Sequence, residues 1–412
     1  MVKRRMVWLM SMVLILSLVL AACAPEREAG NGTKDEKPDK LVVWVNDEDE
    51  QVEALKKMTQ RYTEETGIKI VLDRVALPDQ VDKLALAGPA GNGPDVFFQP
   101  HDPLGDIVAR GLAIPLEIEE DVRSGYSETA LEAFTFDGEL YGAPLVVETL
   151  ALYYNTDLVK NPPKTWEELV EIAEDLTNPS QDEYGFLMAP EFYYGYSLIS
   201  AHGGYIFGGE PGEYNPDDIG LNNKGAVKGA ASIKELYEKR LIPEALTVDV
   251  MDGLFSEGKV GMNISGPWNT AIYGGALGDR IKTAPLSKVN GKVIPTFAGV
   301  KAWLVSYYSE YPEWATDLAL YLSNKESSQT YFEVSGEIPA REGAWEAVDD
   351  PIYDGFIAQI PHSVPMPNVP EMAQVWGPMD DALSFIVKED DMQEVLDEAV
   401  DHIRQDIAAA GH

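Results

Sequence analysis

The sequence has very little cysteine and few positive charges. One cysteine, Cys23, occurs in 412 residues, so the chain can form no internal disulfide and no cysteine cluster that would hold a metal. Lysine and arginine number 32 against 69 aspartates and glutamates, which gives a formal net charge of −37. A chain this acidic is expected to avoid nucleic acid and not to bind anionic lipid through its surface.

The sequence also lacks the common catalytic signatures. It contains no Gly-x-Ser-x-Gly, no phosphate-binding Gly-Lys-Ser/Thr loop and no His-Glu-x-x-His, and its five histidines are scattered. We therefore expect no cofactor and no metal. A glycoside hydrolase needs only two carboxylates at a set separation, and an acidic chain supplies many such pairs by chance. From the residues alone, a lipid-anchored glycoside hydrolase stays open as an alternative.

The N-terminal residues predict export and lipidation. Residues 3–5 form a positive n-region, and residues 7–20 form an apolar h-region that is too short to span a bilayer comfortably. The Leu-Ala-Ala-Cys sequence that ends at Cys23 resembles the lipobox of bacterial lipoproteins. We predict a signal peptide at 1–22, lipidation of Cys23, and attachment to the extracytoplasmic face of the cell membrane. An ordinary signal peptide that ends near Ala22 is the alternative.

After a polar stretch that predicts a flexible tether, strand and helix patterns alternate along the chain. The tether covers residues 23–39. Strands are expected at 41–45, 68–72 and 95–98, and helices are expected between them at 51–66 and 79–87. This order predicts a mostly parallel sheet with helices on both faces, and such sheets bind ligands beyond the carboxyl ends of their strands. The loops after the first and third strands carry Glu48, and His101 with Asp102.

The pattern of residues 141–155 predicts a buried strand with one residue that does not suit a core. Glu148 places a carboxylate in the middle of an apolar run, and a buried charge without a partner is costly. On an edge strand Glu148 would face water, whereas on a strand that lines a cleft it would accept a hydrogen bond from a ligand. We expect this strand to pass from one lobe into another, with the ligand at the crossing.

Several aromatic residues occur together with carboxylates, which is typical of a sugar site. Sugars stack their apolar faces on rings and donate hydroxyl protons to carboxylates. Glu191 with Tyr193 and Tyr194, Trp268, and Trp376 fit this need, although any one ring taken alone is more often a core residue. The remaining tryptophans of the mature chain are expected to pack in the core, on helices or within a lobe: Trp44, Trp166, Trp303, Trp314 and Trp345.

A set of short motifs then resembles the bacterial maltose/maltodextrin-binding proteins. The motifs run in order from about Leu41 to the C-terminus. They are Val43-Trp-Val-Asn46, Thr66-Gly-Ile-Lys69, Gly93-Pro-Asp95, His101-Asp102, Tyr141-Gly-x-Pro144 with Glu148, Asn161-Pro-Pro-Lys-Thr-Trp-Glu-Glu168, Phe255-x-x-Gly258, Ser265-Gly-Pro-Trp268 and Met366-Pro-Asn-x-Pro370. The resemblance implies two α/β lobes of the periplasmic-binding-protein type, each a mostly parallel sheet flanked by helices, and joined by three hinge crossings. It also implies a maltodextrin bound between the lobes, a monomer that delivers it to an ABC transporter permease, and no catalysis.

The resemblance further implies lobe boundaries and site residues. The N-terminal lobe would comprise 40–147 plus 303–346, and the C-terminal lobe 152–297 plus 352–412. Glu48 and Asp102 would accept sugar hydroxyls from the first lobe, and Glu148 would do so from the crossing. In the second lobe Glu191, Tyr193 and Tyr194 would line the site, Trp268 and Trp376 would stack on the sugar, and Met366 would lie nearby.

Some positions depart from the family pattern. At five positions this chain lacks the basic or aromatic residue of the family pattern: Asp49, Gln99, Pro103, Gly377 and Asp380. The site would then have fewer donors around a short sugar, which favours longer maltodextrins over maltose. Another oligosaccharide stays open as the ligand, and an adhesion or structural lipoprotein is a third alternative.

Overall fold

The computed structural model describes residues 37–386 and 391–410. The predicted signal peptide, Cys23 and most of the tether therefore lie outside the described residues. Within the described ranges, every helix is too short or too polar to span a bilayer.

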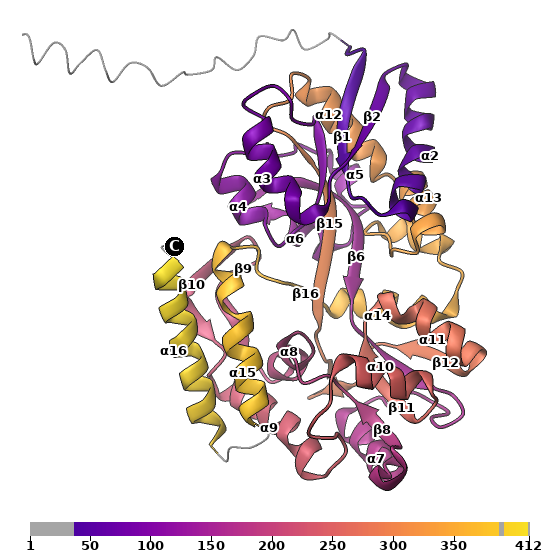
Figure 1. Cartoon of the computed structure of the whole chain (residues 1–412), viewed down its shortest axis with the longest axis vertical. Helices are drawn as coiled ribbons and strands as arrows, with labels where there is room; N and C mark the ends of the chain where they lie inside the picture. The colour runs from indigo at the N-terminus through magenta and orange to yellow at the C-terminus, as the bar shows by residue number, and fades with distance from the viewer. Residues whose placement is uncertain (1–36, 387–390, 411–412) are drawn as a thin grey trace, which may run out of the picture. The chain divides into compact units, whose positions relative to one another are not determined.

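The first sheet confirms the predicted β-α-β-α-β unit. Strand β1 is parallel to both β2 and β3, while β15 runs antiparallel between β3 and β6. The sheet is therefore mixed (Figure 1). It contains β1 (Lys40–Val45), β2 (Lys69–Arg74), β3 (Val96–Pro100), β6 (Gly142–Thr149), β15 (Phe297–Val305) and β16 (Val364–Pro365). The helices between its first three strands are α2 (Asp49–Thr66) and α3 (Leu77–Ala87).

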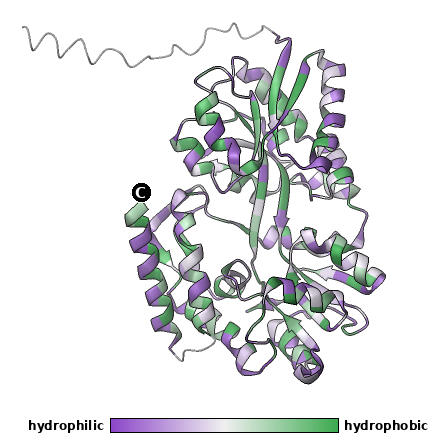
Figure 2. Cartoon of the chain, in the orientation of Figure 1, coloured by the Kyte–Doolittle hydropathy of each residue, from purple (hydrophilic) through white to green (hydrophobic). Residues whose placement is uncertain are grey.

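The core of this lobe follows from apolar spacing on both kinds of element. Helix α2 buries Leu55 and Met58 on one face, and it ends at Gly67, whose φ of 74° only glycine adopts readily. Trp303 is fully buried, with its ring centroid 4.5 Å from that of Phe98. Hydrophobic residues line much of these strands (Figure 2). Further elements of this part of the chain are α4 (Leu104–Ala109), α5 (Glu120–Arg123), α6 (Glu128–Ala133), β4 (Thr135–Phe136), β5 (Glu139–Leu140), α12 (Pro312–Leu322) and α13 (Lys325–Ser335).

The second sheet has the order β12-β7-β11-β8 and is not mostly parallel. Its strands are β7 (Ala151–Asn155), β8 (Tyr184–Leu187), β11 (Val260–Ser265) and β12 (Ile281–Ala284). β7 is antiparallel to both of its neighbours, and β11 is parallel to β8. The expectation of a mostly parallel sheet is therefore wrong here. The reason is that β7 enters directly from β6 without a crossover helix, so nothing imposes a parallel direction on it.

Helices and hairpins complete the second part of the chain. At α7, Thr165 Oγ1 accepts a hydrogen bond from the Glu168 N–H at 3.2 Å, which caps the N-terminus of the helix. The helices are α7 (Trp166–Leu176), α8 (Phe192–Ala201), α9 (Lys224–Glu238), α10 (Val248–Ser256), α11 (Thr270–Leu277), α14 (Asp354–Gln359), α15 (Trp376–Ile386) and α16 (Met392–Ala410). The hairpin strands are β9 (Tyr205–Glu210), β10 (Glu213–Gly220), β13 (Lys288–Val289) and β14 (Lys292–Val293). Short 3-10 helices are η1 (Pro179–Gln181), η2 (Pro267–Asn269), η3 (Gly278–Arg280), η4 (Glu342–Ala347), η5 (Pro351–Tyr353), η6 (Ile360–His362) and η7 (Pro370–Gln374).

The predicted crossing strand is present as two strands. β6 belongs to the first sheet and β7 to the second, and only Leu150 lies between them. The return segment that leads into β15 lies beside it (Figure 1). The hydroxyls of Thr149 and Thr296 are 2.6 Å apart, and Thr149 also donates to the Phe297 carbonyl. Two segments that connect the sheets are thus hydrogen-bonded to each other.

Candidate ligand-binding site

One pocket, which we call the aromatic pocket, gathers four of the predicted site residues. It has a volume of about 720 Å³. Asp102 and Pro103 reach it from the loop after β3, Tyr193 from α8, Met366 from the segment after β16, and Trp376 from the start of α15. Segments that are far apart in the sequence therefore meet at this pocket.

A second pocket, which we call the acidic pocket, holds three more predicted residues: Glu48, Glu148 and Trp268. Its volume is about 760 Å³. Other members of its lining were not predicted, and among them are Gln51, Lys301, Glu337 and Tyr353.

Tyr193 connects the two pockets. Its ring centroid lies 6.5 Å from that of Trp376 in the aromatic pocket and 6.4 Å from that of Trp268 in the acidic pocket. Burial raises the pKa of the Tyr193 hydroxyl, and the nearby carboxylates of Glu148 and Asp102 raise it further. Seven of the nine predicted residues thus line the two pockets, and Tyr193, whose hydroxyl stays neutral, contacts a tryptophan ring of each pocket.

The other two predicted residues lie outside both pockets. Tyr194 is only 4% exposed and packs edge-on against Tyr193, with 5.5 Å between ring centroids. Glu191 is exposed at the start of α8, where burial and the charge of Asp380 raise its pKa. Tyr194 therefore supports the Tyr193 ring by packing against it, and the roles of Tyr194 and Glu191 toward a ligand stay predictions.

Buried aromatic rings pack against the rings that line the aromatic pocket. Phe297, at the start of β15, is fully buried and stacks on Tyr196 at 4.1 Å with an interplanar angle of 4°. The ring of Phe297 is also 5.8 Å from the rings of both Tyr193 and Trp376. Sequence reasoning missed Phe297, because a phenylalanine that begins an apolar strand gives no signal beyond core packing.

Trp268 owes its position to a tight turn. It lies in η2, and the residue is 46% exposed, whereas tryptophan is highly buried on average in folded proteins. A β-carbon on Gly266 would come within 2.1 Å of the Trp268 ring, so only glycine leaves room for it. The Gly266-Pro267 sequence therefore holds an exposed ring at the rim of the acidic pocket.

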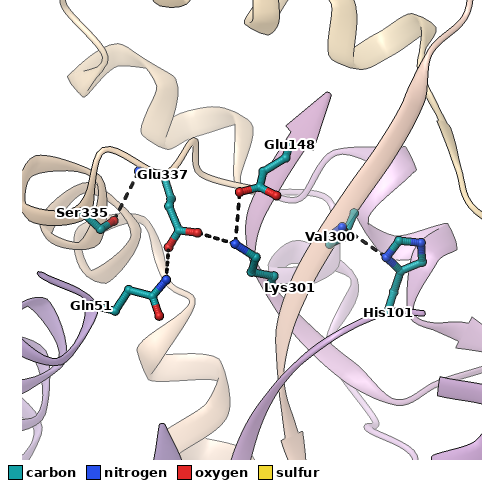
Figure 3. Close-up of polar contacts among 7 residues, drawn as sticks. All are labelled: Gln51, His101, Glu148, Val300, Lys301, Ser335 and Glu337. Atoms are coloured by element: carbon teal, nitrogen blue, oxygen red, sulfur yellow. Dashed lines mark hydrogen bonds and ion pairs between the residues drawn. The ribbon is translucent and has the colours of Figure 1, made fainter. Parts of the chain in front are cut away.

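Glu148 is not the unpaired charge that its sequence context suggests. The Nζ of Lys301, on β15, donates to Glu148 Oε1 at 3.0 Å and also to Glu337 (Figure 3). Burial raises the pKa of Glu148, and Lys301 offsets this only in part because Lys301 is shared with Glu337, which repels Glu148. Burial tends to lower the pKa of Lys301, but the two carboxylates outweigh burial and raise it. A lysine within the otherwise apolar sequence of β15 was the available signal for this pair.

His101 fixes the loop that carries Asp102. Its Nδ1 accepts a hydrogen bond from the Val300 N–H at 3.2 Å (Figure 3), so its Nε2 carries the proton and donates to the Met366 carbonyl at 3.2 Å. The ring is fully buried. One histidine thus holds the segments of Asp102 and Met366, which both line the aromatic pocket.

Three of the five departures from the family pattern, Asp49, Gln99 and Asp380, make structural contacts in this chain. Asp49 pairs with Arg74 at 2.8 Å on the surface, and Gln99 is buried and donates to the Leu77 carbonyl. Asp380 Oδ1 accepts a hydrogen bond from the Phe192 N–H at 2.7 Å. Phe192 is the first residue of α8, so Asp380 caps the helix that carries Tyr193. Pro103 lines the aromatic pocket, and Gly377 is exposed on α15.

Comparison with known proteins identifies the family. Residues 57–355 match the family described as bacterial extracellular solute-binding protein. The chain belongs to this family. The galactooligosaccharide-binding protein of Bacillus subtilis (strain 168) is 37% identical over 409 residues, which cover 96% of this chain and 95% of that protein. The maltodextrin-binding protein of the same organism is 32% identical over 374 residues, which cover 88% and 87%.

Solved structures agree with this family. A cyclo/maltodextrin-binding protein complexed with maltotetraose is 38% identical, with a TM-score of 0.86 and coverage of 90% of this chain and 98% of that chain. An extracellular solute-binding protein from Staphylococcus aureus in complex with maltose is 39% identical, with a TM-score of 0.88 and coverage of 91% and 100%.

These comparisons confirm the predicted resemblance and the two-lobed α/β fold. This solute-binding protein is not an enzyme, because its family and relatives are binding proteins. The glycoside hydrolase alternative is therefore wrong.

Proposed function

We propose that this solute-binding protein captures maltodextrins at the aromatic and acidic pockets and delivers them to the permease of an ABC transporter. One observation carries the proposal. The ring centroids of Trp268 and Trp376 lie 6.4 Å and 6.5 Å from that of Tyr193, and the carboxylates of Asp102 and Glu148 line the same two pockets. Ring faces next to acceptors match the apolar faces and hydroxyl edges of linked glucose units.

The proposal includes attachment to the membrane through Cys23. The lipobox pattern supports it, and a relative in Streptococcus pneumoniae is named a solute-binding lipoprotein. The protein would then act as a monomer at the extracytoplasmic face of the cell membrane. Replacing Cys23 with serine should release it into the soluble fraction. If the Cys23→Ser protein stays in the membrane fraction, the anchor lies elsewhere.

A galactooligosaccharide is the second candidate ligand, because the Bacillus subtilis protein of that name is 37% identical over nearly the whole chain. The same site chemistry serves both ligands, since galactose and glucose both offer an apolar face and a rim of hydroxyls. The two candidates differ in the direction of single hydroxyls and in linkage. Only a direct comparison of ligands separates them.

Titration calorimetry at one pH with maltose, maltotriose, maltotetraose and a galactooligosaccharide tests the proposal. Maltotriose and maltotetraose should bind more tightly than maltose, because each further glucose adds a stacked face of about 1 kcal/mol. Equal affinity for maltose and the longer chains would contradict the predicted length preference. Binding of the galactooligosaccharide without binding of any maltodextrin would establish the second candidate instead.

A further inference from the structure

The acidic pocket contains one positive charge among many negative ones. Of the described residues that line it, Lys301 alone is cationic. Six carboxylates line the same pocket: Glu48, Glu50, Glu148, Glu333, Glu337 and Asp350. A cation in this position governs which charged groups a ligand can bring into the pocket.

Lys301 has donor capacity that its protein partners do not use. An ammonium has three N–H donors, and Lys301 gives one to Glu148 and one to Glu337. Within residues 37–386 and 391–410, its third N–H has no hydrogen-bond partner. Its side chain is 18% exposed and lines the pocket. A ligand group there can therefore accept a hydrogen bond from Lys301.

Two acceptors beside Lys301 are also unused. Glu148 Oε2 receives no hydrogen bond from the described protein groups, while Glu148 Oε1 receives that of Lys301. Gln51 is only 6% exposed, and its Nε2 donates to Glu337 at 3.1 Å while its Oε1 is buried without a donor (Figure 3). A ligand hydroxyl can donate to Glu148 Oε2, whereas Gln51 Oε1 is buried beneath the pocket surface.

We propose that Lys301 is a specificity-determining residue that donates to one hydroxyl of a sugar while Glu148 accepts from the neighbouring hydroxyl. The inference rests on the proposed function, because it assigns a role within the same site. A hydroxyl both donates and accepts, so two adjacent hydroxyls satisfy an ammonium and a carboxylate held 3.0 Å apart. This pair therefore recognises a neutral diol.

The same pair disfavours a charge of the wrong sign at each position. An amino group in place of the hydroxyl that faces Lys301 would carry a positive charge against the ammonium, and a carboxylate in place of the hydroxyl that faces Glu148 would carry a negative charge against Glu148 and Glu337. Both substitutions place like charges close together in a half-buried pocket, where repulsion is stronger than in water. Without Lys301, six carboxylates would instead attract an amino sugar.

Two variants test this role. Lys301→Met removes the ammonium and keeps an unbranched chain. The double variant Lys301→Met/Glu337→Gln also removes one carboxylate, so the net charge of residues 148, 301 and 337 stays at one negative, as in the wild type. If Lys301→Met fails to fold, this charge-matched variant gives the answer. The ligands are maltotriose and amino-deoxy maltotrioses in which one hydroxyl at a time is replaced.

The wild type should bind at least one amino-deoxy maltotriose more than tenfold more weakly than maltotriose. Both variants should bind maltotriose about 10- to 100-fold more weakly, the range for loss of a charged hydrogen bond, and should bind that analogue more tightly than the wild type does. Variants that bind weakly with unchanged discrimination between the two ligands would assign Lys301 a structural role and overturn the inference. If the wild type binds no maltodextrin at all, the proposed function fails instead.

Discussion

Different interactions hold the residues of the aromatic pocket and of the acidic pocket in place. In the aromatic pocket Trp376 packs on other rings, with its centroid 5.8 Å from those of both Phe192 and Phe297. In the acidic pocket Glu148 and Glu337 share one lysine, which leaves one negative charge uncompensated. Ring packing favours folding, whereas a half-buried surplus charge opposes it. Binding and stability should therefore fall together in the first pocket and move in opposite directions in the second.

The largest loss of stability and ligand binding together is expected for Trp376→Ala. The variant should lose about 2–3 kcal/mol of unfolding free energy, below the 3–5 kcal/mol of a fully buried tryptophan because Trp376 is half-buried. Maltotriose binding should weaken by about 1–3 kcal/mol.

Titration calorimetry measures the change in binding and thermal melting the change in stability, with Trp268→Ala as the matched control. Because Trp268 is 46% exposed, its loss should weaken binding and leave the melting temperature nearly unchanged. Equal destabilisation by the two variants would contradict the expected difference between the aromatic and acidic pockets.

Glu148→Gln should weaken maltotriose binding by about 1.5–3 kcal/mol, the range for a hydrogen bond to a charged group. The same variant should raise the melting temperature at neutral pH. Burial raises the folded-state pKa of Glu148 above its unfolded value. Its contribution to stability is then fully present below the unfolded pKa and is lost as the pH rises through the folded pKa.

The melting-temperature difference between Glu148→Gln and the wild type should therefore be largest at neutral pH and should close as the pH falls. Glu50→Gln is the control, because Glu50 lines the same pocket but is exposed. A lower melting temperature for Glu148→Gln at neutral pH would mean that the ion pair with Lys301 outweighs the cost of burial.

A smaller effect is expected for Asp380→Ala, which removes the acceptor for the first N–H of α8. Loss of a helix cap costs about 0.5–2 kcal/mol of unfolding free energy. Binding should weaken less than tenfold, since α8 positions Tyr193 but Asp380 lies outside both pockets. The exposed neighbour Asp381 provides the control as Asp381→Ala. If the two variants have the same melting temperature, the cap has no measurable role.

The smallest change in stability is expected for Gly266→Ala, which acts on the acidic pocket alone. The new β-carbon would lie 2.1 Å from the Trp268 ring, so the ring must move. Ligand affinity should fall as it does in Trp268→Ala, with a change in unfolding free energy below about 1 kcal/mol. Gly275→Ala, with open space around its β-carbon, should leave affinity unchanged. Unaltered affinity in Gly266→Ala would show that the Trp268 ring has room to shift without loss of its contact with the sugar.

Local patterns in the sequence predicted much of the fold. Helix α2 and its stop at Gly67 follow from apolar spacing and glycine conformation, and the division of residues 141–155 between two sheets follows from a carboxylate in an apolar run. The antiparallel second sheet was missed because strand direction depends on how the chain enters the sheet. For the site, seven residues predicted from distinctive motifs line the two pockets, and their contact with a ligand stays a prediction. Lys301, Glu337 and Phe297 were missed because their roles arise from partners that are distant in sequence.

The position of β15 has a consequence for the order in which the chain acquires its structure during synthesis. This strand pairs with β3 and β6, and the contact between His101 and Val300 joins residues 199 positions apart. Until Val305 has left the ribosome, β3 and β6 lack the strand that pairs with both of them, and their edges expose unpaired backbone groups. Long-range pairing of this kind forms slowly, and unfinished sheets aggregate. The pairing of β15 with β3 and β6 can therefore form only after all four strands of the second sheet have been synthesised.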